Sequence, residues 1–194
     1  MRGLVLMATL VFAGPALAGY DSAYTDFDLK TCKQLLPETS GEDGESNGIL
    51  ECKGYMGMPV TFAEGDLRSF VAFGGGGQDH CAFHQTFGGF NSTGNKIEWW
   101  LKDGKPIASI LRWTVSYDPE DSSKTKSWLV VTKIDEGQSC HIGYVEGSYP
   151  KANEKARWLA DAAAEAFFCK VGKTIFFASA VTVTDGIAAE GGCE

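Results

Sequence analysis

The chain contains three histidines, and two of them stand at a spacing that suits a metal site. His80 and His84 flank Cys81, and a helical i, i+4 spacing would put both imidazole rings on one face. Imidazole and thiolate are zinc ligands, yet a closed zinc site needs four ligands. Because Cys81 is expected to be oxidised, we predict no metal site and no cofactor, and His80 and His84 remain the candidate ligands if a metal binds.

The third histidine, His141, directly follows Cys140. Side chains alternate along a strand, so these two side chains would point to opposite faces of a sheet. His141 would act as a general base only if folding brings a nucleophile or a carboxylate to it. The alternative is a histidine that packs in the core or lies on the surface.

Three charged residues, Glu64, Asp66 and Arg68, alternate along a short segment. On an extended backbone their side chains would share one face. Two carboxylates can divide the acid and base roles when their surroundings separate their pKa values. The alternative is an ion pair between the arginine and one carboxylate that stabilises a strand edge or a turn.

Two adjacent tryptophans are candidates for a binding surface. A strand would direct Trp99 and Trp100 to opposite faces. If one indole is exposed, a carbohydrate or a partner protein could stack on it, because the ring combines a large apolar face with a polar N–H. The alternative is that both faces of the strand are covered and both indoles pack inside.

The elements that must position these residues are mainly strands. Asp103 and Gly104 separate two apolar-rich runs by the two residues that a type I′ turn prefers, which predicts a β-hairpin over residues 97–117 with Trp100 opposite Ile107. Further strands are expected within residues 49–74 and at 128–134, 140–145 and 174–183. The acidic, turn-rich segment 37–48 is expected to be a loop.

One amphipathic helix is predicted over residues 150–168, because apolar residues recur there at helical spacing. They are Ala152, Ala156, Leu159, Ala160, Ala163 and Phe167. A helix with one apolar face has to cover another element. We therefore predict an α+β fold class: an antiparallel sheet with one main amphipathic helix packed on it, and loops held by disulfides.

The first eighteen residues have the pattern of a cleavable signal peptide. Arg2 precedes an apolar run at residues 4–13, and an A-x-A cleavage site ends at Ala18. The apolar run is too short to cross a bilayer as a helix. We expect a signal peptide at 1–18, a single globular domain at 19–194, a periplasmic or secreted location and no membrane insertion.

Six cysteines behind an export signal predict three disulfides. One bridge would close the acidic segment at its base, and a second would pin the predicted helix to its sheet. The third joins the two cysteines that remain. The predicted pairs are Cys32 with Cys52, Cys140 with Cys169, and Cys81 with Cys193.

Acidic residues outnumber basic ones. The chain has 25 Asp and Glu against 17 Lys and Arg, a formal net charge of −8, which loss of Arg2 with the signal peptide would make more negative. Such a charge repels polyanions, so we expect no nucleic-acid partner. It would instead steer the protein toward a basic partner.

Several segments resemble a group of uncharacterised exported proteins of alphaproteobacteria. The resemblance rests on CKGYMGMPV at 52–60, EGDLRSFV at 64–71, Tyr24-Thr25, Gln85-Thr86, Val130-Val131-Thr132-Lys133 and Cys140-His141. These segments are spread over residues 24–141, which is most of the chain after the signal peptide. The resemblance implies export, and it brings no activity and no catalytic residues with it.

The leading functional hypothesis is a non-enzymatic periplasmic binding or accessory protein that recognises an envelope protein or glycan through aromatic and loop surfaces. A second hypothesis is an inhibitor of an exported hydrolase such as a lysozyme, where the acidic charge would assist association with a basic enzyme. The third is a small periplasmic hydrolase that uses His141 or the pair Glu64 and Asp66.

Overall fold

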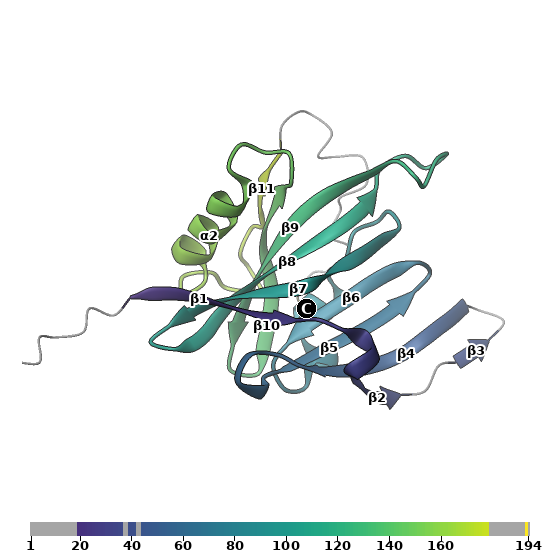
Figure 1. The fold of residues 1–194 in the computed structure, drawn as a ribbon, viewed down its shortest axis with the longest axis horizontal. Helices are drawn as coiled ribbons and strands as arrows, with labels where there is room; N and C mark the ends of the chain where they lie inside the picture. The colour runs from purple at the N-terminus through teal and green to yellow at the C-terminus, as the bar shows by residue number, and fades with distance from the viewer. Residues whose placement is uncertain (1–18, 37–38, 42–43, 179–192, 194) are drawn as a thin grey trace, which may run out of the picture.

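The computed structural model describes residues 19–36, 39–41, 44–178 and 193, so the predicted signal peptide lies outside the described residues. The chain forms two β-sheets and one main helix (Figure 1). Sheet A consists, in spatial order, of β1 (Tyr20–Asp26), β7 (Asn91–Lys102), β8 (Lys105–Ser116), β9 (Thr125–Asp135), β10 (Gln138–Glu146) and β11 (Ile175–Phe177). Sheet B consists of β2 (Lys33–Leu36), β4 (Gly44–Lys53), β5 (Pro59–Gly65) and β6 (Arg68–Phe73), with β3 (Thr39–Gly41) paired to β4.

The helices are few and short. The main one, α2 (Ala152–Ala163), follows β10, and α1 (Cys81–His84) is a single turn after β6. Three 3₁₀ turns complete the described elements: η1 (Leu29–Thr31), η2 (Tyr55–Gly57) and η3 (Gly77–Asp79). The neighbouring strands in both sheets run antiparallel, except that β11 runs parallel to β10.

Sheet A is the middle of three layers. One apolar cluster lies between the two sheets and includes Val60 and Phe73 from sheet B with Trp99 and Trp113 from sheet A. A second cluster lies between the other face of sheet A and α2. Because adjacent residues of a strand face opposite sides, β7 to β10 supply side chains to both clusters, which explains why these strands are apolar along most of their length.

The predicted hairpin is confirmed, with a different register. Asp103 and Gly104 both have positive φ, 50° and 76°, as a type I′ turn requires. A bulge shifts the pairing beyond the turn, so Trp100 lies opposite Ala108 and not opposite Ile107. The two turn residues were enough to predict the hairpin. The bulge depends on packing between distant residues, which the local sequence does not reveal.

Three other expectations need correction. The segment predicted as a loop at 37–48 contributes β3 and the start of β4, which pair with each other. The helix covers Ala152–Ala163, shorter than the predicted 150–168, and Lys151 before it adopts a left-handed backbone with φ 57°. In the predicted strand 174–183 the described residues form only the short β11. The fold is mostly β, with two sheets where one was predicted, and so fits an α+β class only loosely.

The six cysteines form three disulfides, in the pairs that the sequence analysis favours. Cys32–Cys52 joins the chain after η1 to β4, Cys140–Cys169 joins β10 to the segment after α2, and Cys81–Cys193 joins α1 to residue 193. Each bridge of this kind contributes about 2–4 kcal/mol to stability. Disulfides persist in oxidising compartments, which fits an exported protein.

Candidate functional site

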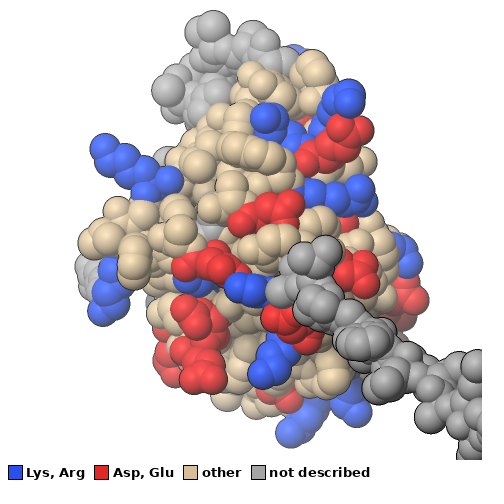
Figure 2. All heavy atoms as spheres, turned by 90° about the vertical axis from the view of Figure 1, so that its left-hand side faces the viewer, with Lys and Arg blue, Asp and Glu red and all other residues tan. Residues whose placement is uncertain are grey.

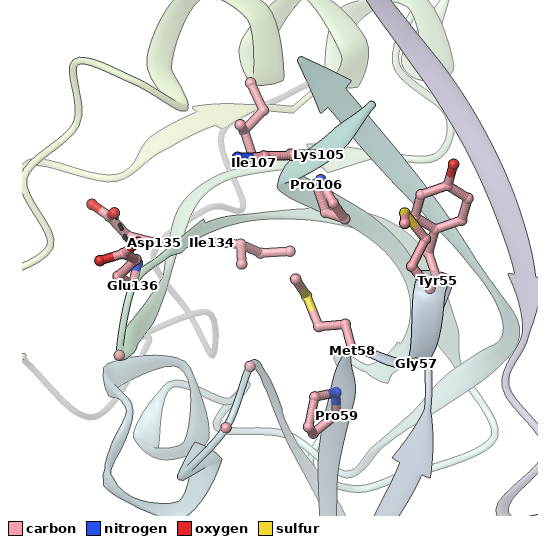
Figure 3. Close-up of a pocket in the computed structure, with 14 residues that line it drawn as sticks. Tyr55, Gly57, Met58, Pro59, Lys105, Pro106, Ile107, Ile134, Asp135 and Glu136 are labelled. Carbon is pink, nitrogen blue, oxygen red and sulfur yellow. Dashed lines mark hydrogen bonds between the residues drawn. The ribbon is translucent and has the colours of Figure 1, made fainter. Parts of the chain in front are cut away.

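A groove of about 650 Å³ lies between connections of sheet B and strand ends of sheet A. Four segments line it: residues 55–59 between β4 and β5, the glycines that follow β6, the start of β8, and the turn from β9 to β10. These segments are distant in sequence, and the pairing within each sheet brings them together around the groove (Figure 3).

The inner part of the groove, which we call the apolar throat, consists of Tyr55, Met58, Pro59, Pro106 and Ile134. Met58 from the sheet B side and Ile134 from sheet A point toward one another across it (Figure 3). Ile134 is buried in the cluster between the sheets, and Tyr55 and Met58 pack against that cluster. The throat is therefore continuous with the hydrophobic core.

Met56, at the edge of the groove, combines two features that folding does not explain. Its backbone is left-handed, with φ 52° and ψ 26°, a conformation that costs free energy for a residue other than glycine, asparagine or aspartate. Its side chain is 82 % exposed. An asparagine would suit this backbone better, and the thioether leaves an exposed apolar group at the edge of the groove.

Charged residues surround the throat. Lys105 is exposed at the start of β8, and no carboxylate of the described residues lies within ion-pair distance of it. On the other side, Asp135 pairs with Lys133 at 3.5 Å and accepts a hydrogen bond from the Glu136 backbone N–H at 2.9 Å. Figure 3 shows the side chains of Asp135 and Glu136 directed away from Met58, so the throat itself stays apolar.

His141 lies in the interior, where its imidazole cannot reach a substrate as a general base. Its side chain is 2 % exposed, its Nδ1 is 2.7 Å from Tyr144 Oη, and its ring packs edge-on against Trp113. The backbone N–H of His141 donates to Gln85 Oε1 at 2.7 Å. Burial lowers the pKa of His141 to about 3. The imidazole is therefore neutral at physiological pH.

The two other histidines do not come together. His80 is buried, and its Nδ1 lies 3.1 Å from Ser139 Oγ, while His84 is exposed at the end of α1. A serine beside a histidine resembles a nucleophile with its base, but Ser139 is fully buried and its Oγ already accepts from the Phe73 N–H. Among the described residues no cluster of three His, Cys, Asp or Glu side chains could hold a metal ion.

The prediction that Glu64, Asp66 and Arg68 share one extended face is wrong. Asp66 and Leu67 have φ of 50° and 57° and form the turn between β5 and β6. Arg68 instead donates to Asp66 Oδ2 at 2.6 Å, which is the turn-stabilising ion pair given as the alternative. The carboxylate of Asp66 is mainly solvent-exposed, so this pair adds little stability.

Trp99 and Trp100 do face opposite sides of β7, and both are buried. Trp99 is completely buried between the sheets and donates from Nε1 to Thr25 Oγ1 at 2.8 Å. Trp100 is 9 % exposed on the α2 side, where its Nε1 donates to Asp161 Oδ1 at 2.9 Å. Neither indole offers a free face for stacking.

Sequence reasoning therefore missed the residues that line the groove. Two signals were available: the run Tyr-Met-Gly-Met-Pro at 55–59, which places two methionines beside a glycine with φ 79°, and the apolar residues directly next to the two hairpin turns. Neither signal identifies a groove unless the sheet pairing is known.

Comparison of the chain with protein-family models, with curated proteins and with solved structures finds no match. No helix within the described part of the chain has the length and apolar character needed to cross a membrane. On the face that carries α2 and β1, acidic and basic side chains are interspersed, without a large area of one sign (Figure 2).

Proposed function

We propose that the chain is a non-enzymatic periplasmic binding protein whose groove holds an apolar group of an envelope component. The observation that carries the proposal is the apolar throat, open to solvent yet continuous with the core. A volume of about 650 Å³ lies within the range of small-molecule and cofactor sites, which are mainly apolar with a few polar groups at the edge.

The side chains of the groove suit a ligand of variable shape. Methionine is unbranched and polarizable, so it adapts to irregular apolar surfaces and is common at binding sites that accept several partners. Met56 is almost fully exposed and Met58 is partly buried, so one thioether lies at the edge and the other inside. An apolar group entering between them would be covered on both sides.

The hydrolase hypothesis has less support. A general base must reach the proton that it removes, and its pKa should lie near the working pH. His141 is buried with its pKa lowered to about 3, and Asp66 is occupied by Arg68 in an exposed turn. The inhibitor hypothesis stays a prediction from the net charge.

A matched pair of substitutions tests the proposal. Met56 and Leu67 are both exposed apolar residues with left-handed backbone, but Leu67 lies in the β5–β6 turn at the other end of those strands. Asparagine adopts this backbone readily, so Met56→Asn and Leu67→Asn should both fold. The uncharged dye N-phenyl-naphthylamine, which fluoresces in apolar surroundings, reports occupancy of the groove.

We expect the dye to bind the wild type and Leu67→Asn with equal affinity. Met56→Asn should weaken binding several-fold, and Met58→Gln, which keeps the side-chain length but places an amide in the throat, should weaken it about tenfold. Phospholipids from the bacterial envelope should displace the dye. Absence of dye binding, or equal affinity in all four proteins, would contradict the proposal.

A further inference from the structure

A second hollow, of about 350 Å³, lies at the far end of β8 from the groove and shares no residue with it. It forms where the loop before β7 meets the turn after β8. The backbone joins the two walls, since the Ser116 N–H donates to the Phe90 carbonyl at 2.8 Å. The lining residues are Gly88, Gly89, Phe90, Ser116, Tyr117, Asp118, Pro119 and Ser122.

Two aromatic rings in this hollow are partly exposed. Phe90 is 44 % and Tyr117 52 % exposed, and within the described residues neither ring stacks on another aromatic ring. Among the other exposed rings, Tyr20 stacks on Trp100 and Trp158 meets Phe177, whereas Tyr24 and Phe168 also lack an aromatic partner within the described residues. Tyr117 contacts the Lys126 ammonium, 5.4 Å from its ring centre. Ring surface is thus available here for a ligand.

The polar groups of the hollow can bind hydroxyls. The side-chain oxygens of Ser116 and Ser122 have no hydrogen-bond partner among the residues that the structure describes. Asp118 accepts from the Glu120 N–H at 2.9 Å and pairs with Lys124 at 2.6 Å. Lys124 lowers the pKa of Asp118, which keeps this carboxylate ionised, and each of its oxygens has a further lone pair for an incoming donor.

Charge near the hollow is only partly balanced. Lys124 pairs with Asp118, and Lys126 lies 3.3 Å from Glu146. Glu120 and Asp121 belong to the same turn, so an acidic excess remains that disfavours an anionic ligand. The hollow therefore combines ring faces, free hydroxyls and an acceptor carboxylate in a mildly acidic setting.

We propose that this hollow is a saccharide-binding site, in which Phe90 or Tyr117 packs against the C–H face of a pyranose while Ser116, Asp118 and Ser122 bind its hydroxyls. A pyranose has these two features, an apolar face and a polar edge, and a lipid chain or an apolar peptide would leave the free hydroxyls unpaired. The site goes beyond the proposed function, because it neither uses the apolar groove nor depends on it.

The test uses the mature, oxidised protein and three trisaccharides: N-acetylated chitotriose, cellotriose and maltotriose. Titration is followed by calorimetry for the wild type and for Tyr117→Ala, Phe90→Ala and Tyr24→Ala. Tyr24 is the matched control, because it is 51 % exposed on β1 and lies outside the hollow. Circular dichroism confirms that each variant is folded.

We expect at least one trisaccharide to bind with a dissociation constant in the millimolar range or below, and Tyr117→Ala or Phe90→Ala to weaken it about tenfold. Tyr24→Ala should bind as the wild type does. Preference for chitotriose would indicate an N-acetylated glycan, and preference for cellotriose or maltotriose a glucan. No binding of the three sugars, or equal binding in all variants, would overturn the saccharide site and leave the groove proposal unaffected.

Discussion

The two faces of sheet A are packed by different kinds of side chain. The face toward sheet B carries large rings, among them Trp99, Trp113 and Tyr144, which contact Phe73 and Phe87. Apart from Trp100, the buried side chains on the face toward α2 are small or aliphatic, and the helix presents Ala152, Ala156, Leu159 and Ala160 to it, followed by Ala164 at the helix C-cap.

The difference follows from what each layer has to accommodate. Two sheets pack about 10 Å apart, so the residues between them must be large enough to fill that space. A helix with alanines on its inner face can approach a sheet closely. At Gly143 the approach is so close that a Cβ atom would overlap Leu159 Cδ2 and lie 2.9 Å from the Ile175 carbonyl oxygen. Size, and not hydrophobicity alone, distinguishes the two layers.

The largest effect is expected from removing a ring between the sheets. Trp99→Ala should lower the free energy of unfolding by about 3–5 kcal/mol, because it leaves a cavity between the two sheets. Trp158→Ala, on the outer side of α2 where the ring is 52 % exposed, should cost less than about 1 kcal/mol. Urea unfolding measures both. Similar losses in the two variants would show that the inter-sheet layer collapses around the cavity.

Acid should weaken the inter-sheet layer through His141. Its pKa is about 3 in the folded protein and about 6.5 in the unfolded chain, so between these values the unfolded chain binds a proton that the folded one excludes. Stability is therefore complete above pH 6.5 and falls as the pH decreases. From pH 6 to pH 4 the free energy of unfolding should drop by about 2–3 kcal/mol.

The control for this prediction is His141→Gln, whose amide can still bond to Tyr144 but does not titrate. Its stability should change little between pH 6 and pH 4. Lys96 and Lys124 lower the pKa values of the surface carboxylates Asp26 and Asp118. These two groups therefore lose their contribution to the free energy of unfolding only below about pH 4. The same pH dependence in wild type and variant would refute the assignment to His141.

On the helix side, adding a single methyl group should be enough to disrupt packing. Gly143→Ala should cost about 1–3 kcal/mol, because α2 or β11 must move outward to admit the new Cβ. Gly75→Ala is the matched control, since nothing lies within 4 Å of a Cβ there and its φ is not in the left-handed region. Thermal or urea unfolding compares the two. If Gly143→Ala is as stable as the wild type, α2 does not pack against β10 as closely as the Gly143–Leu159 contact indicates.

The smallest effects concern the two indole hydrogen bonds. Thr25→Val removes the acceptor of the Trp99 N–H, and Asp161→Ala removes that of the Trp100 N–H. Trp99 is fully buried, so its N–H stays unsatisfied and the cost should be about 1–2 kcal/mol. The N–H of Trp100 can find water, which limits the cost to about 0.5–1 kcal/mol. Equal costs in urea unfolding would indicate that water reaches both indoles.

Local signals in the sequence predicted part of this fold. The Asp103-Gly104 turn identified the β7–β8 hairpin, and the spacing of apolar residues identified α2. The Cys140–Cys169 pair followed from its position relative to the helix, the Cys32–Cys52 pair from the acidic segment between the two cysteines, and Cys81–Cys193 joined the two that remained. Such features depend on neighbouring residues, which a single sequence displays.

Other features depend on contacts between distant segments. The chain from Glu64 to Arg68 contains no glycine at its two turn positions, so nothing local distinguished the Asp66-Leu67 turn from an extended strand. The division into two sheets, and the bulge that pairs Trp100 with Ala108, are set by packing across the layers. The burial of both tryptophans follows from that division.

The candidate sites were beyond local prediction for the same reason. The groove assembles four segments whose sequence positions span residues 55 to 137, and the hollow at Phe90 and Tyr117 joins two loops. The sequence of each segment alone predicts only a turn with one or two apolar residues. Only the strand order makes them neighbours.

The bulge in β10 determines where the length of this strand can change. His141 pairs with Thr132 and Gly143 with Val131, so Ile142 is an extra residue between two consecutive pairs. Removing Ile142 would restore the regular alternation of side chains. His141 and Tyr144 would still face sheet B, and Val145 would still face α2. Removing Gly143 would also restore the alternation, but it would bring the Ile142 side chain to a place where a Cβ overlaps Leu159, and removing a residue outside the bulge would turn part of the strand over. A variant of this protein that is one residue shorter in β10 should therefore lack Ile142.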